Sequence, residues 1–236
     1  MVFPFRDHLR SSTRPWVTGA LIAVNVAAFV YELSLGPAIE GFLSTYGVVP
    51  ARLVDAWTGG QRDWAEASSI LSSIFLHGGW LHLIFNMWFL WIFGDNVEDR
   101  LGHGRYLILY LAAGAAAAVA HVLANPSSTL PTVGASGAIA GVLGAYFVTY
   151  PRARVTTLIP VFVFIHVTEL PAWLVLGMWF LLQFLSGSLA LGTTQASAGG
   201  VAWWAHIGGF AAGILLMPLL SVGRPRARRR ARGRRG

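Results

Sequence analysis

Long stretches without a charged residue alternate along this chain with short polar segments. Four stretches free of Asp, Glu, Lys and Arg cover residues 15–31, 67–94, 106–151 and 170–223. An apolar helix of about 20 residues spans the hydrocarbon core of a bilayer. The last two stretches are too long for one such helix, and clusters of turn-forming residues divide them at 125–131 and 192–200. Each of these two stretches therefore predicts two helices.

The hydrophobic pattern as a whole predicts six membrane-spanning helices and an all-α, polytopic membrane protein. The expected helices cover residues 15–35, 70–94, 106–124, 135–150, 171–187 and 202–221. Residues 155–168 are also apolar, but they number only 14 and include Pro160. Because this length is too short for a span, it predicts an interfacial or re-entrant segment.

The composition supports a membrane protein and excludes several other classes. Hydrophobic residues make up 55% of the 236 residues, charged residues make up only 11%, and the mean hydropathy is +0.59. Soluble domains contain about 25% charged residues, so both a soluble globule and a disordered chain are disfavoured. The chain has no cysteine, which excludes disulfides, thiolate catalysis and cysteine-ligated metal sites. We expect neither a metal nor a cofactor.

The distribution of arginine predicts how the helices are oriented. All 17 basic residues are Arg, and eight of them lie in the last 13 residues. With six spans and a cytoplasmic N-terminus, 15 of the 17 Arg residues lie inside, in agreement with the positive-inside rule. We therefore expect a cytoplasmic segment at 1–14, a membrane domain at 15–221 and an Arg-rich cytoplasmic tail at 222–236, in the plasma membrane. The tail favours anionic lipid headgroups over nucleic acid as a partner.

The first connection on the outer side, residues 36–76, is long for a membrane protein. It carries Phe42, Tyr46, Trp57 and Trp64. Aromatic side chains of this kind are enriched at the membrane–water interface. The segment therefore predicts short helices that lie in or on the outer leaflet.

Four polar side chains fall at matching depths in the second, fourth and sixth expected helices, which all run from outside to inside. Ser136 lies near the start of the fourth helix and His206 near the start of the sixth. His82 and Asn86 share one face of the second helix because they are four residues apart. Any one of these residues alone is more often structural, but polar groups inside spans are costly and commonly functional. Their common depth predicts one site.

Glycines near these residues suit close helix packing. Gly134 and Gly137 flank Ser136, and Gly209 and Gly213 follow His206. Small residues let membrane helices approach closely, so packing of the fourth helix on the sixth would bring the serine towards the histidine. A histidine base can activate a serine nucleophile. The carboxylates lie on other segments, which predicts a Ser–His dyad with His82 and Asn86 as donors to an oxyanion.

These motifs resemble those of the rhomboid intramembrane serine proteases. The matching segments are Gly134-Ala-Ser-Gly137, Ala205-His-Ile-Gly-Gly-Phe-Ala-Ala-Gly213, His77-x4-His82-x3-Asn86 and Val97-Glu-Asp-Arg-Leu-Gly102. The resemblance implies a six-helix rhomboid-like bundle, Ser136 as nucleophile and His206 as base. It implies an oxyanion hole formed by His82, Asn86 and the Ser136 backbone N–H. It also implies transmembrane protein substrates, cleaved near the outer face of the membrane and admitted between the second and fifth helices.

The chain departs from the family pattern beside the histidine. Many bacterial relatives have a tyrosine four residues after the serine, stacked on the histidine, whereas this chain has Ala140. Trp203 and Trp204 are the aromatic residues that we expect could take its place. Many relatives also carry a Trp-Arg pair in the first outer loop, and this chain has Arg62-Asp-Trp64 in a different order.

Three other functions are compatible with parts of the pattern. A catalytically silent relative would bind membrane clients, but it would not need both Ser136 and His206. A transporter or channel would use polar groups at mid-depth, but the spans lack paired acidic residues and a clear inverted repeat. A metalloprotein could use His77, His82 and His206, although the sequence has no H-E-x-x-H motif and His77 is expected to point away from His82.

Overall fold

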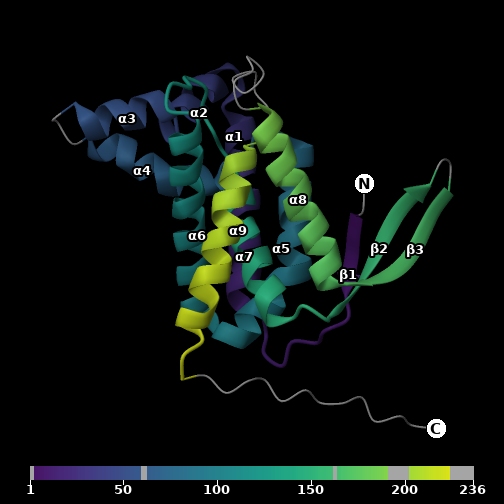
Figure 1. Ribbon diagram of the computed structural model, residues 1–236. Helices are drawn as coiled ribbons and strands as arrows, with labels where there is room; N and C mark the ends of the chain where they lie inside the picture. Colours follow the sequence, from purple (N-terminus) through teal and green to yellow (C-terminus); the bar gives the residue numbers. More distant parts are fainter. Residues whose placement is uncertain (1–2, 60–62, 162–163, 191–201, 224–236) are drawn as a thin grey trace, which may run out of the picture.

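A computed structural model describes residues 3–59, 63–161, 164–190 and 202–223 of the chain. Most of these residues are helical, and the long helices form a bundle (Figure 1). These long helices are α1 (Trp16–Ser34), α5 (Trp80–Leu101), α6 (His103–Ala124), α7 (Ser136–Thr149), α8 (Ala172–Ala190) and α9 (Trp203–Leu220). The prediction of a helical bundle is thereby confirmed.

Helix α7 lies at the centre of the bundle. Its residues from Gly137 to Tyr146 are all buried, whereas the other long helices bury only part of their surface. A helix that is apolar all round is typical of a position enclosed by other helices. Ser136 is the first residue of this enclosed helix.

Four described helices, α1, α6, α8 and α9, are long and apolar enough to cross a membrane. Helix α5 passes the same test together with the preceding helices α4 (Trp64–Ser72) and η2 (Ser73–Phe75), from which it is bent by 76°. Helix α7 has only 14 residues. The chain is therefore a multi-pass membrane protein, while the count of six crossings stays a prediction.

The second predicted span begins and ends later in the structure than the hydrophobic pattern indicates. We expected residues 70–94, but α5 covers 80–101. The Gly78-Gly79 pair precedes the helix and separates it from η2. At the other end, the helix continues through charged residues because Glu98 accepts hydrogen bonds from α1.

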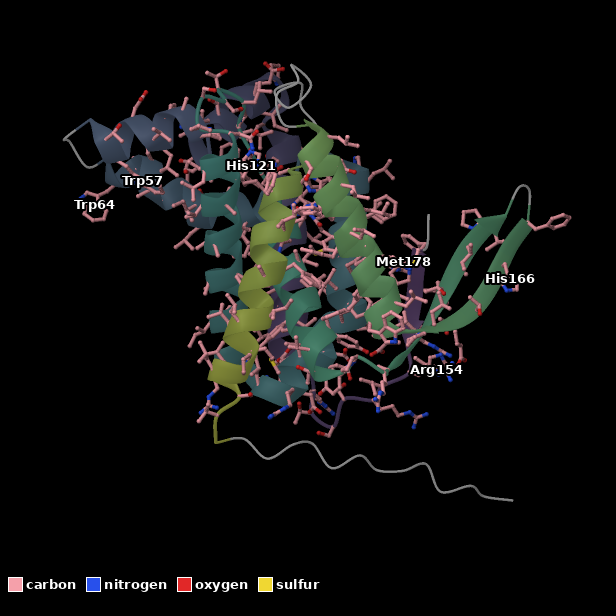
Figure 2. All side chains as sticks on the ribbon, viewed as in Figure 1. Trp57, Trp64, His121, Arg154, His166 and Met178 are labelled. Carbon is pink, nitrogen blue, oxygen red and sulfur yellow. The ribbon has the colours of Figure 1, made fainter. Side chains whose placement is uncertain are left out.

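The connection that we expected on the outer side contains short helices, as predicted. They are α2 (Ile39–Tyr46), α3 (Pro50–Thr58) and α4, with the 3-10 turn η1 (Gly36–Ala38) before them. Helices α3 and α4 form an arm that projects from one end of the bundle (Figure 1). Trp57 and Trp64 lie on this arm and are 49% and 74% exposed (Figure 2). Their exposure leaves the predicted contact with the outer leaflet sterically possible.

A small antiparallel sheet is the main departure from an all-α fold. Strand β1 (Phe3–Asp7) pairs with β2 (Arg154–Val161), which pairs with β3 (Phe164–Pro171). The apolar segment 155–168, which we expected to be interfacial or re-entrant, therefore forms most of a β-hairpin. β-Branched residues recur through it, and such residues favour strands. The sheet projects from the end of the bundle opposite the α3–α4 arm (Figure 1).

The predicted division at residues 14 and 221 stays a prediction. Strand β1 lies within the 1–14 segment and pairs with β2. Most of the predicted Arg-rich tail, from residue 224, and the turn cluster at 192–200 lie outside the described residues.

Candidate active site

Helices α7 and α9 touch through their backbones. A Cβ atom placed on Gly209 would overlap the carbonyl oxygen of Gly137, and one on Gly213 would overlap that of Gly141. Only glycine permits so close an approach. On the other side of α7, Gly137 and Gly141 face the methyl groups of Ala117 and Ala113 on α6. The predicted packing of the fourth expected helix on the sixth is thus present in the structure.

Ser136 stands where α7 begins, beside a tight turn. The backbone N–H groups of the first helical turn have no partner within the helix, and Ala135 at the N-cap supplies no side-chain acceptor. The Gly134 backbone has φ +133°, a conformation that favours glycine, and its N–H donates to the Ser73 carbonyl at 2.9 Å. The start of α7 therefore presents backbone donors next to the Ser136 hydroxyl.

His82 lies against the same turn. A Cβ atom on Gly134 would be 2.7 Å from His82 Nε2 and 3.6 Å from Ser136 Oγ. The imidazole and the hydroxyl therefore both border the small space left by this glycine. The structure brings together two of the predicted site residues, one from α5 and one from α7.

His206 is buried in the first turns of α9, with 8% of its surface exposed. The preceding residue, Ala205, lies beside Gly137, the neighbour of Ser136. The Nδ1 atom of His206 is 2.6 Å from Oε1 of Gln183 on α8. This contact occupies Nδ1 and leaves Nε2 as the nitrogen available to a serine hydroxyl.

The aromatic partner of His206 differs from our expectation. Trp179 of α8 lies with its ring centroid 5.7 Å from that of His206, at an interplanar angle of 36°. Trp203 meets the imidazole only edge-on, at 6.5 Å and 89°. Sequence proximity favoured Trp203 and Trp204, but both precede His206 on the same helix, whereas stacking needs a ring from a neighbouring helix.

Asn86 and His77 form a second pair at the site. Asn86 Nδ2 lies 3.1 Å from His77 Nε2, and the His77 and His82 ring centroids are 5.2 Å apart. The expectation that His77 points away from His82 was therefore wrong. It assumed one continuous helix, whereas His77 lies in the non-helical turn before α5. The buried Glu32 carboxylate accepts the His77 backbone N–H, which fixes this turn from α1.

The histidines do not form a metal-ligating group. Within the described ranges, no three His, Asp or Glu side chains are arranged to hold a metal ion. His77, His82 and His206 thus lack the common point that a three-histidine zinc site requires. The geometry gives the metalloprotein alternative no support.

A cavity of about 30 Å³ borders Ser136. Its polar lining comes from Ser73, His121, Thr132 and Ser136. His121 Nε2 lies 3.0 Å from Thr132 Oγ1, and Figure 2 places His121 near the end of the bundle that carries the α3–α4 arm. A polar space of this size can hold a water molecule.

Sequence reasoning missed Gln183, Trp179 and three polar residues of the cavity lining, which are Ser73, His121 and Thr132. Gln183 is the one amide side chain in the apolar segment of α8, and Trp179 lies four residues before it on the same face. A search for every polar residue inside an apolar run would have found Gln183. Its link to His206 required the packing of α8 on α9.

Comparison with known proteins extends the likeness beyond the motifs. The Rhomboid domain model matches residues 64–223. Rhomboid protease GluP of Bacillus subtilis (strain 168) is 36% identical over 133 residues, which are 56% of this chain and 24% of that protein. Rhomboid protein 1, mitochondrial, of Saccharomyces cerevisiae is 32% identical over 142 residues, 58% of this chain and 37% of that protein.

A third relative aligns over more of the chain. RHOMBOID-like protein 4 of Arabidopsis thaliana is 29% identical over 223 residues, 86% of this chain and 52% of that protein. The alignments thus cover about half or less of the length of each of these three relatives. Because the family model matches most of the chain, the protein belongs to the rhomboid family.

Proposed function

We propose that this protein is an intramembrane serine endopeptidase in which Ser136 is the nucleophile and His206 the general base. The observation that carries the proposal is the close contact of α7 and α9 at Gly137 and Gly209, which holds a serine and a buried histidine at the same end of two adjacent helices. Family membership supports the same class of activity. A Ser–His pair is sufficient for nucleophilic catalysis of acyl transfer.

In the first chemical step, Ser136 Oγ attacks the carbonyl carbon of the scissile peptide bond. His206 Nε2 takes the hydroxyl proton and then gives it to the leaving amine, so that an acyl-enzyme and a free amino terminus result. The negative charge that develops on the carbonyl oxygen is stabilised by the free N–H groups at the start of α7. His82 and Asn86 supply the side-chain donors of this oxyanion hole.

The second step needs water beside the acyl-enzyme. The cavity next to Ser136 is polar and large enough for a water molecule. A water held there attacks the ester carbon, with His206 again accepting the proton. His206 then returns the proton to the Ser136 oxygen, and the amino-terminal fragment of the substrate leaves with a new carboxylate end.

The substrates in this proposal are transmembrane proteins cut near the outer face. A peptide bond within a helix is shielded by its hydrogen bonds, so the substrate must present an extended segment, and residues that destabilise helices favour cleavage. We propose that the substrate enters between α5 and α8. Helix α5 carries His82, and α8 carries Gln183, which contacts His206 of α9.

The orientation of the protein follows from its arginines. Side-chain nitrogen atoms gather at the end of the bundle opposite the α3–α4 arm (Figure 2). We infer that this end is cytoplasmic, that both termini lie on that side of the plasma membrane, and that the tail contacts anionic lipid headgroups. The start of α7 then lies towards the outer face.

Cleavage of a tagged transmembrane substrate in proteoliposomes tests the proposal. Ser136→Ala should abolish cleavage because the attacking oxygen is removed, and His206→Ala should reduce it to nearly the same level. Matched controls are Ser68→Ala on the α3–α4 arm and His166→Ala on β3, both exposed and remote from the site. Each control should cleave at the wild-type rate.

Two results would overturn the proposal. Cleavage by Ser136→Ala at a rate comparable to the wild type would exclude a serine nucleophile at this position. Loss of wild-type cleavage after treatment with a metal chelator would indicate a metal-dependent reaction instead.

A further inference from the structure

Gln183 places a single amide deep in an otherwise apolar region of α8. Gln183 is only 7% exposed, and its Oε1 atom is 2.6 Å from His206 Nδ1. The aromatic ring that lies over the same imidazole, that of Trp179, comes from the preceding turn of the same helix. Helix α8 therefore meets His206 both through an aromatic ring and at one nitrogen.

The chemistry of this hydrogen bond selects one tautomer of the histidine. An amide oxygen can only accept a hydrogen bond, so the contact requires that Nδ1 of a neutral His206 carry the proton. Nε2 then has a lone pair and can accept a proton from Ser136. The other tautomer carries its proton on Nε2 and cannot act as a base there.

The same contact becomes stronger as the reaction proceeds. When Nε2 takes the serine proton, the imidazole becomes positively charged, and hydrogen bonds from charged donors are stronger than neutral ones. An amide also avoids placing a carboxylate in an apolar bundle, where an ionised group is costly. A glutamine can therefore fill a place that a carboxylate occupies in Ser-His-Asp triads.

We propose that Gln183 is a positioning residue that holds His206 in the tautomer and orientation needed to deprotonate Ser136. This inference rests on the proposed function of Ser136 and His206. It makes the site a Ser–His–Gln arrangement rather than the isolated dyad that the sequence predicted. Trp179 packs at a tilt against the same ring and so restricts its rotation.

Three variants separate this role from simple packing. Gln183→Leu keeps much of the side-chain volume but removes the acceptor, and Gln183→Glu restores an acceptor with a charge. Leu182→Ala is the control, because Leu182 is the neighbouring residue on α8 and is 49% exposed. The measurement is kcat and KM for a transmembrane substrate as a function of pH.

Gln183→Leu should lower kcat roughly 10- to 100-fold, the range expected for a misplaced catalytic group, with little change in KM. Gln183→Glu should recover most of kcat at neutral and higher pH. Its activity should also fall off at a higher pH than that of the wild type when the solution is acidified, because a carboxylate stabilises the protonated imidazole. Leu182→Ala should match the wild type in kcat, in KM and in the pH dependence of its activity.

A purely structural role for Gln183 would give a different pattern. Wild-type kcat in Gln183→Leu, or a pH profile of Gln183→Glu that coincides with the wild type, would overturn the inference. Ser136→Ala is measured in parallel. If Ser136→Ala is inactive while Gln183→Leu is fully active, only the positioning role fails, whereas cleavage by Ser136→Ala would refute the proposed function itself.

A second measurement needs no substitution at Gln183 and keeps the test valid if the Gln183 variants do not fold. Nitrogen-15 NMR of histidine-labelled wild-type protein in detergent distinguishes protonated from unprotonated ring nitrogens. We expect a protonated Nδ1 and an unprotonated Nε2 for His206, assigned by comparison with His206→Ala. The reverse pattern would overturn the proposal.

Discussion

Two groups of polar side chains lie near opposite ends of α5, and they differ in how their hydrogen-bonding capacity is used. One is the Ser136 cluster, made of Ser136, His82, Asn86, His206 and Gln183. The other is the Glu98 cluster, made of the side chains of Glu98, Thr18 and His103 together with the backbone N–H of Val17. His82 and Glu98 are separated by about 24 Å along the helix, at the usual rise per residue.

The Glu98 cluster is saturated. The buried Glu98 carboxylate accepts the backbone N–H groups of Val17 and Thr18, both at 2.8 Å, and the Thr18 hydroxyl at 2.6 Å. It also lies 2.6 Å from His103 Nδ1. A charged acceptor with this many partners ties the start of α1 to the end of α5.

The Ser136 cluster keeps its reactive atoms free. Among the described contacts, Ser136 Oγ and His206 Nε2 make no hydrogen bond, although His206 Nδ1 is bound to Gln183. The comparison teaches how the two roles differ inside one apolar bundle. The Glu98 carboxylate, which ties two helices together, uses both of its oxygens as acceptors, while Ser136 borders the cavity and keeps its hydroxyl free of described hydrogen bonds.

The largest expected effect is on stability, at Glu98. Glu98→Gln replaces one acceptor oxygen by an N–H₂ group, which leaves the Val17 N–H without a partner and faces His103. We expect the free energy of unfolding to fall by about 3–4 kcal/mol, measured as a lower thermal midpoint in detergent. Glu40→Gln, on the exposed surface of α2, is the control. An unchanged midpoint in Glu98→Gln would contradict the structural role.

The next effect is on turnover and concerns the contact beneath the Ser136 cluster. Gly209→Ala places a methyl group against the Gly137 carbonyl and should separate α9 from α7. A displacement of about 1 Å can lower the rate roughly 100-fold. The control is Gly177→Ala on α8, whose Cβ would meet only Phe147 at 3.8 Å. Equal turnover in the two variants would show that this contact does not set the site geometry.

The smallest effect concerns Asp7, at the same end of the bundle as Glu98. Asp7 accepts hydrogen bonds from the Tyr146 hydroxyl and from Asn96 Nδ2, both at 2.8 Å. Burial raises the pKa of Asp7 from 3.8 to about 7, and the nearby Asp95 charge contributes. The folded state therefore binds more protons than the unfolded state between these values, so stability falls as the pH rises through this window.

Asp7→Asn removes this pH dependence but keeps an acceptor oxygen. Its thermal midpoint should equal that of the wild type at about pH 3, below the unfolded pKa, and exceed it at about pH 8. A midpoint difference that is the same at both pH values would show that Asp7 does not bind a proton on folding.

Much of the bundle could be predicted because its signals are local. Charge-free runs marked α6, α7, α8 and α9 to within a few residues. The pairing of β1 with β2 could not be predicted in this way, since the two strands are separated by about 150 residues. The start of α5 was also missed, because a Gly-Gly pair in an apolar run reads either as a flexible point or as a break.

In the candidate site too, some residues carry a local sequence signal and others depend on long-range packing. Ser136 and His206 were marked by glycines beside them in sequence, and the structure confirms that their helices pack together. Gln183 and Trp179 carried no such local signal, because their importance depends on which face of α8 meets α9. The predicted orientation of His77 was wrong for a related reason. The position of this side chain depends on a turn that Glu32 on α1 holds in place.

Covalent labelling of the purified protein with a fluorophosphonate tests the central claim most directly, because the reagent reacts with an activated serine. Peptide mapping by mass spectrometry should find the adduct on Ser136 alone. His206→Ala should lose most of this adduct, while Ser68→Ala should keep it. An adduct on another serine, or equal labelling of Ser136 in the wild type and in His206→Ala, would contradict a serine nucleophile activated by His206.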